Sequence, residues 1–116
     1  MYVFVYGTLK RGHGNNRRLA TSTFITEDSL NEGFNMISLG AFPALIPTDE
    51  PLAPITGEVF QVTEAVLTNE LDSLEGYPSF YNRKVVKSAL GYDVWVYYFD
   101  EAEPYYGHDM LANGEW

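Results

Sequence analysis

A glutamate lies on the apolar face of the best-defined helical segment. Leu67, Leu71 and Glu75 are spaced four residues apart, so they share one face of a helix. Glu75 also falls in the last turn before Gly76, where the helix dipole disfavours a negative charge. Lost hydration and that dipole both raise the pKa of a carboxyl toward the range suited to general acid/base catalysis. The same pattern also fits a helix that frays at Gly76 with Glu75 in water, so both interpretations stay open.

A second candidate lies where the first predicted strand ends. Residues 1–6 are apolar throughout and are followed by Gly7 and Thr8. A buried strand that runs into such a pair exposes successive backbone N–H groups, which can bind a carboxylate or phosphate oxygen. A plain turn is the alternative. The segment is not a nucleotide-binding P-loop, because Gly12 is followed by His13 rather than by lysine.

Other polar and aromatic residues give weaker signals. Tyr77, Tyr81 and Arg83 follow the helix and could line a pocket, or could pack in the core with a wet edge. His13 and His108 have no second ligand at metal spacing, so the sequence predicts no metal site. A serine–histidine–acid triad is not excluded, but the Gly-x-Ser-x-Gly nucleophile elbow is absent.

The composition excludes several classes of function. The 116 residues include no cysteine, which removes disulfides, thiolate zinc sites and a cysteine nucleophile. A net charge of −9 argues against nucleic acid as a partner. All seven basic residues lie within residues 10–18 and 83–87; they could form one basic mouth, or be ordinary charges paired with acidic neighbours. No apolar run reaches the ~20 residues of a membrane span. We expect a cytoplasmic protein.

The spacing of apolar and turn residues predicts one α+β domain over residues 1–116. Thr63 and Gly76 delimit a helix over residues 64–75, and Asn15 could cap a shorter one ending near residue 20. Strand-like segments occupy residues 1–6, 33–39, 41–46, 55–62, 81–88 and 92–99. Few strands are separated by helices, which disfavours a doubly wound parallel sheet. We expect a small mixed, mostly antiparallel sheet curled into a β-barrel with flanking helices, and Trp116 docked onto it.

Four segments carry a family resemblance. They are VFVYGTLKRG at residues 3–12 followed by Asn15, GEVF at residues 57–60, LDSLEGYP at residues 71–78 followed by Tyr81 and Arg83, and VWVY at residues 94–97. With these segments the chain resembles the gamma-glutamyl cyclotransferase-like proteins, and within them the gamma-glutamylamine cyclotransferase branch. The resemblance spans about residues 1–100.

The resemblance implies a reaction and a set of roles. The α-amine of a γ-glutamyl group attacks its own γ-carbonyl, which releases 5-oxoproline and a free amine. Glu75 would be the general acid/base, the backbone at Tyr6, Gly7, Thr8 and Leu9 would bind the glutamyl group, and Tyr81 would shape the pocket. The resemblance implies no cofactor, a small γ-glutamyl substrate as the partner, and a monomer or homodimer without nucleic acid or membrane.

A second function stays open beside this one. A non-catalytic binding or regulatory module could use the same pocket for a small carboxylate. An inward-facing glutamate near the anion-binding loop favours the enzyme, because a binding module needs no carboxylate beside a bound anion. A lid over the pocket could come from the tail after Asp100.

Overall fold

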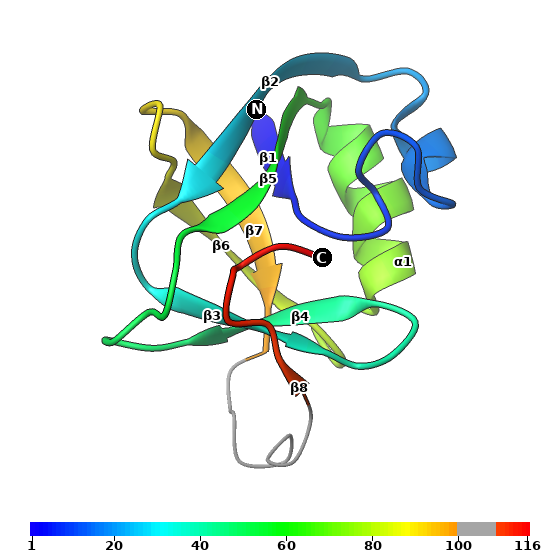
Figure 1. Ribbon diagram of the computed structural model, residues 1–116. Coiled ribbons are helices and arrows are strands. Elements are labelled where there is room, and N and C mark those ends of the chain that lie inside the picture. The colour runs from blue at the N-terminus through cyan, green and yellow to red at the C-terminus, as the bar shows by residue number, and fades with distance from the viewer. Residues whose placement is uncertain (100–108) are drawn as a thin grey trace.

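The strands form two sheets in the computed structural model, which describes residues 1–99 and 109–116 (Figure 1). The order is β2-β5-β1-β7-β6 in the larger sheet and β4-β3-β8 in the smaller. The bounds are Tyr2–Val5 for β1, Thr23–Leu30 for β2, Phe34–Ser38 for β3, Pro43–Pro47 for β4, Ile55–Gln61 for β5, Asn82–Lys87 for β6, Asp93–Tyr98 for β7 and Asp109–Met110 for β8. In these residues only the β1–β7 pair is parallel. The predicted α+β class with a mixed, mostly antiparallel sheet is confirmed.

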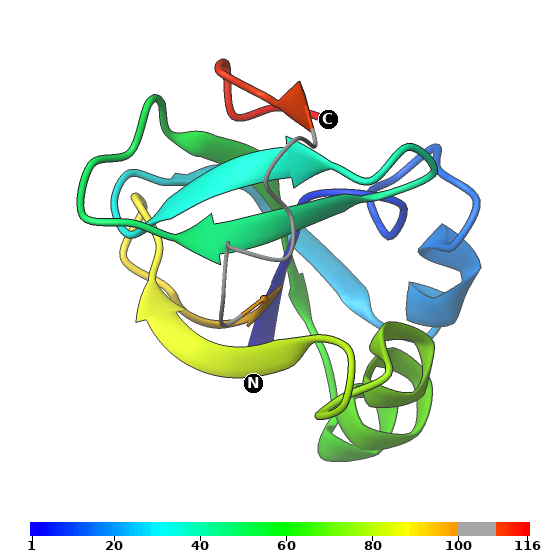
Figure 2. The ribbon, with the colours of Figure 1, turned by 90° about the horizontal axis from the view of Figure 1, so that it is seen from below.

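The barrel is not confirmed. In the described part of the chain, β2 and β6 are the two edges of the larger sheet and do not pair with each other. Seen from below, β3 and β4 lie over β6 and β7, and the helix covers one flank (Figure 2). The curled strands therefore form two sheets packed together rather than one closed cylinder.

Strand β1 occupies the centre of the larger sheet, as its unbroken apolar sequence predicts. It pairs with β5 on one side and with β7 on the other. Its side chains alternate between two clusters of buried residues. Val3 and Val5 pack with Leu67 and Leu71 of the helix, whereas Phe4 packs in the cluster of the neighbouring sheet. This central strand carries the chain from the core directly to the loop that begins at residue 6.

The predicted helix over residues 64–75 is present, with wider turns in its middle. The Thr63 hydroxyl accepts a hydrogen bond from the Val66 N–H at 3.2 Å, as a helix cap does. A π-helical stretch covers Val66–Leu71 and α1 covers Asp72–Glu75. Gly76 then ends the helix in the left-handed region, with φ 64°. The helix does not fray at Gly76, so the backbone of Glu75 is fixed.

Two elements differ from the sequence predictions. The short helix after Asn15 is a 3-10 helix, Asn16–Leu19, and the Asn15 side chain donates to the Thr8 hydroxyl at 2.9 Å instead of capping it. Strand β2 was not predicted, because Glu27, Asp28 and Ser29 interrupt its apolar pattern. It forms the edge of the sheet beside β5, where alternate residues face water.

The last residues of the chain lie against the loop that follows β1. The Trp116 ring packs 5.7 Å from the His13 ring, and the Lys10 ammonium donates to the Trp116 carbonyl oxygen at 2.9 Å. The predicted docking of Trp116 is therefore confirmed. The part of the tail in which a lid was expected, including His108, lies mostly outside the described residues.

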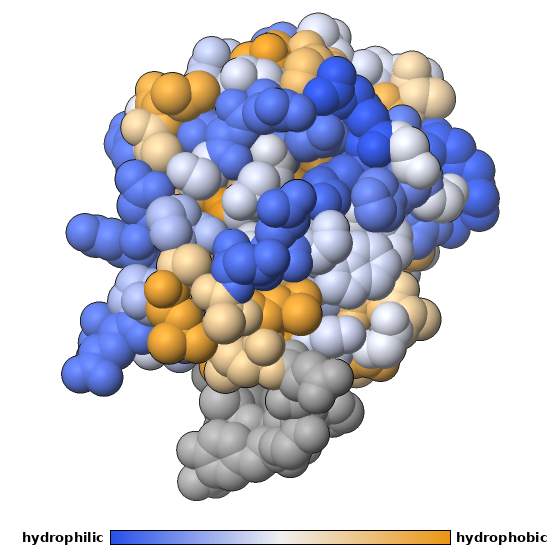
Figure 3. Space-filling model, viewed as in Figure 1, coloured by the Kyte–Doolittle hydropathy of each residue, from blue (hydrophilic) through white to orange (hydrophobic). Residues whose placement is uncertain are grey.

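Hydrophilic residues cover much of the upper part of one face, and hydrophobic residues gather below, beside β8 (Figure 3). None of the helices in residues 1–99 and 109–116 is long and apolar enough to cross a membrane.

Candidate active site

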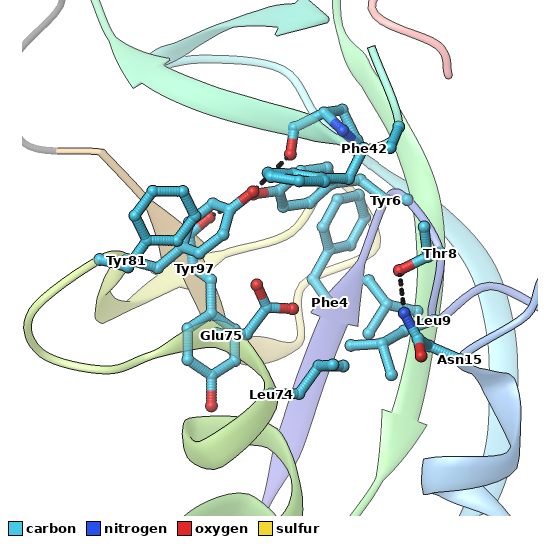
Figure 4. A pocket seen from close by; sticks show the side chains of 15 residues that line it. Phe4, Tyr6, Thr8, Leu9, Asn15, Phe42, Leu74, Glu75, Tyr81 and Tyr97 are labelled. Atoms are coloured by element: carbon cyan, nitrogen blue, oxygen red, sulfur yellow. Dashed lines mark hydrogen bonds between the residues drawn. The ribbon is translucent and has the colours of Figure 1, made fainter. Parts of the chain in front are cut away.

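A cavity of about 330 Å³ opens where the end of β1 meets the end of the helix (Figure 4). It brings together segments that are far apart in the sequence. Its walls are residues 4–9, Asn15, residues 41–43, Leu74, Glu75, Phe80, Tyr81 and Tyr97. All the site residues predicted from the sequence are in this set, so the fold brings the loop after β1 and the helix end to one place.

The Glu75 carboxylate points from the helix end into this cavity (Figure 4). Gly76 turns the chain sharply after it, and the Tyr81 N–H donates to the Glu75 carbonyl oxygen at 3.2 Å, which closes the turn around the glutamate. Within the described residues the carboxylate makes no hydrogen bond or ion pair. Burial raises the pKa of Glu75 from 4.5 to about 7. A carboxyl with this pKa can take and return a proton near neutral pH.

Three tyrosines form the wall around Glu75, and their hydroxyls bind the protein itself. Tyr6 donates to the Tyr97 carbonyl oxygen at 2.6 Å, and Tyr81 donates to the Pro43 carbonyl oxygen at 2.7 Å. Burial is the main cause that raises the pKa of both Tyr6 and Tyr97, and the nearby negative charge of Glu75 raises both further. These tyrosines therefore stay protonated and shape the cavity rather than act as bases.

The loop after β1 uses its carbonyl groups internally and leaves N–H groups available. The Lys10 N–H donates to the Gly7 carbonyl oxygen at 3.1 Å, and the Asn15 N–H donates to the Thr8 carbonyl oxygen at 3.0 Å. The N–H groups of Thr8 and Leu9 have no backbone partner within the part of the chain that the structure describes. Successive free N–H groups at a strand end can bind an anionic oxygen.

Glu58 positions this loop, a role that the sequence analysis missed. Its buried carboxylate accepts the Arg11 N–H at 2.8 Å and the Arg11 Nε–H at 3.2 Å. The Arg11 guanidinium also lies 3.6 Å from the centre of the Phe24 ring. A glutamate on an otherwise apolar strand was the available signal. Its function is to connect β5 to the loop at a point beside the cavity.

Asp72 was interpreted from the sequence as part of the solvated helix face, and that interpretation is wrong. Its two oxygens accept hydrogen bonds from the Arg83 guanidinium at 2.8 and 3.1 Å, and the Tyr97 hydroxyl donates to it at 2.6 Å. The guanidinium also stacks on Tyr77 and Trp95, at 4.4 and 4.3 Å from the ring centres. This cluster connects the last helical turn to the β6–β7 hairpin and so fixes the direction of Glu75.

Comparison with known proteins decides the family. The family model described as "Gamma-glutamyl cyclotransferase, AIG2-like" matches residues 3–116. A Vibrio cholerae relative is 32% identical over 114 residues, which cover 98% of this chain and 93% of the relative. This chain belongs to the gamma-glutamyl cyclotransferase family, and it is a cyclotransferase-like enzyme.

Solved structures agree with this assignment. The Escherichia coli protein YtfP, a gamma-glutamylcyclotransferase family protein, is 28% identical over 116 residues, and its solution structure superposes with a TM-score of 0.72 over 100% of this chain and 96% of that chain. A mouse AIG2-like protein is 25% identical with a TM-score of 0.80, over 97% and 86% of the two chains. The Kluyveromyces lactis allophanate hydrolase shares 16% identity over 19% of its length, which shows the fold alone.

Basic side chains do not form the mouth of the cavity in this family member. Among the described residues, none of the residues that line the cavity is lysine or arginine. Arg11, Arg18, Arg83 and Lys87 pair with acidic residues. The alternative of ordinary paired charges therefore describes the two basic segments better.

Proposed function

We propose that this enzyme cyclises a small γ-glutamyl compound to 5-oxoproline and a free amine, with Glu75 as the general acid/base. The observation that carries the proposal is the unpartnered Glu75 carboxylate in the cavity, with a pKa of about 7. The available N–H groups of Thr8 and Leu9 in the same cavity support it.

The chemistry needs a proton carrier at one point of the cavity. Glu75 takes a proton from the α-ammonium group of the substrate, and the freed amine attacks the γ-carbonyl carbon to form the new C–N bond. As this bond forms, the attacking nitrogen loses a second proton. Glu75 returns a proton to the leaving nitrogen while the old C–N bond breaks, and the released amine takes its last proton from water. Atoms balance without a cofactor.

The loop and the tyrosines supply position rather than protons. The backbone at Tyr6, Gly7, Thr8 and Leu9 binds the glutamyl α-carboxylate and carbonyl, and Tyr81 closes the wall that keeps the glutamyl chain curled. Holding the amine and the carbonyl at attack distance replaces a search in solution, which is a large part of the barrier in such reactions.

The first test is the substrate class. We expect turnover of γ-linked glutamyl amides that carry a free α-amine, measured as 5-oxoproline by chromatography. Acetylation of the α-amine removes the nucleophile, so it abolishes turnover while binding of the γ-glutamyl compound is retained in calorimetry. Equal turnover of α-linked glutamyl peptides contradicts the proposal, and binding without any turnover favours the carboxylate-binding module.

The second test is Gly7. A Cβ atom at Gly7 would lie 2.7 Å from Cδ and Cγ of Pro43, which lines the same cavity. Gly7→Ala therefore displaces the loop or Pro43, and we expect ~10-fold weaker binding of 5-oxoproline in calorimetry. Gly14→Ala is the matched control, because a Cβ there meets no atom within 4 Å. Unchanged binding by a folded Gly7→Ala protein would show that this loop is not the anion site.

A further inference from the structure

The side of the cavity away from the loop is apolar. Thr8 and Asn15 lie on one side of the Glu75 carboxylate, and Tyr81 lies on the other (Figure 4). Beyond Tyr81 is Phe80, whose ring lies 5.2 Å from the Tyr81 ring. A glutamyl group that is bound at the loop and reacts at Glu75 therefore directs its leaving amine toward Phe80.

Phe80 is exposed but held in place. Its side is open to solvent, with 50% of the residue exposed. Its ring nevertheless packs edge-on against Phe42 at 6.2 Å, Tyr81 at 5.2 Å and Phe99 at 5.1 Å. Together with Phe42, Leu74 and Ala41, it makes an apolar rim to the cavity. An exposed aromatic ring that is already ordered binds an apolar group without a further loss of conformational freedom.

A carboxylate on the leaving group finds no cation at this rim. The residues lining the cavity include no lysine or arginine within the described part of the chain. Residues 100–108, which the structure does not describe, contain no lysine or arginine in the sequence. Glu75 is itself a carboxylate and repels a second anion.

We infer that this enzyme prefers γ-glutamyl compounds whose leaving amine carries an apolar group without a carboxylate, and that Phe80 determines this preference. The inference rests on the proposed function and adds the class of amine to it. Covering the rim removes aromatic surface from water, whereas an anion at the same place loses hydration without gaining a partner.

Two substrates that differ in one group test the inference. γ-Glutamylphenethylamide and γ-glutamylphenylalanine share the glutamyl group and the benzyl group, and only the second carries a carboxylate on the leaving amine. We expect kcat/KM to be ~10- to 100-fold higher for the amide, in the range that pocket contacts give. γ-Glutamylmethylamide, which lacks the ring, should fall below γ-glutamylphenethylamide by ~10-fold. Equal kcat/KM values, or a preference for the acid, overturn the inference and leave the proposed function standing.

A substitution at the rim should shift the ratio of the two kcat/KM values. Phe80→Lys places a cation where the leaving group lies, so the preference for the amide should fall by ~10-fold or reverse. Leu90→Lys is the matched control, because Leu90 is 62% exposed on the distant β6–β7 turn and makes the same change in charge. The ratio is measured within one protein, so it does not depend on how much of a variant is folded. An unchanged ratio in Phe80→Lys removes Phe80 from the role.

Failure of the two proposals can be told apart. If neither compound yields 5-oxoproline, the proposed function fails. Calorimetry then still compares how tightly the two compounds bind, and tighter binding of γ-glutamylphenethylamide supports the apolar rim. Equal binding, or tighter binding of γ-glutamylphenylalanine, overturns it.

Discussion

Glu75→Gln should lower kcat by ~10²- to 10⁴-fold, the usual contribution of a general acid/base group. Glutamine has nearly the shape of glutamate but cannot exchange a proton. The cavity should therefore keep its form and still bind the γ-glutamyl compound, so calorimetry should give a dissociation constant close to that of the unchanged protein. Steady-state formation of 5-oxoproline measures the loss in rate.

The pH profile identifies the proton carrier. Glu75 must be ionised to accept the first proton, and its pKa is about 7. We expect kcat/KM to rise with pH through about 7 and then to level off. The residual activity of Glu75→Gln should lack this rise. A variant that turns over at the normal rate, or one that keeps the same rise, contradicts the assignment of Glu75.

Glu64→Gln is the matched control on the same helical segment. Glu64 is exposed, does not line the cavity, and its side chain makes no contact recorded within the described residues. The same chemical change at this position should leave kcat nearly unchanged. Glu70 is a poorer control because it forms an ion pair with Arg18 at 3.4 Å. Thermal unfolding of each variant separates a loss of rate from a loss of fold.

Local patterns were enough to predict the parts of the site that depend on neighbours in sequence. The four-residue spacing placed Glu75 on the buried side of the helix, and Gly76 marked where the helix ends. The apolar run of residues 1–6 gave the central strand and the start of the loop. These signals are local, so the sequence carries them directly. The resemblance to a known family then joined the two segments into one site.

The remaining features depend on contacts between distant segments. Asp72 has the spacing of a solvated residue, but Arg83 and Tyr97 approach it only after the hairpin packs on the helix. Glu58 is explained only by Arg11, which is 47 residues away in the chain. Strand β2 forms because β5 offers it an edge, despite its polar residues. None of these partners follows from local periodicity.

The stability of the protein should depend on pH through Glu75. Its pKa is about 7 in the folded protein against 4.5 for the free side chain. Between these values the folded protein binds more protons at this group than the unfolded chain does, so the free energy of unfolding falls as pH rises. The contribution is fully present below pH 4.5 and is lost as pH passes about 7. The difference in pKa corresponds to about 3 kcal/mol.

Glu75→Gln removes the charge and should remove this loss. We expect the variant to be more stable than the unchanged protein by about 3 kcal/mol above pH 8, and by only about 1 kcal/mol at pH 5. Urea unfolding at the two values measures the difference, and pH 5 is the practical lower end because the sequence pI is about 4.4. Glu64→Gln, on the exposed face, should show no such widening. A constant difference between the variant and the unchanged protein across this range would mean that Glu75 is hydrated in the folded state, and the same hydration would remove the physical reason for its acid/base role near neutral pH.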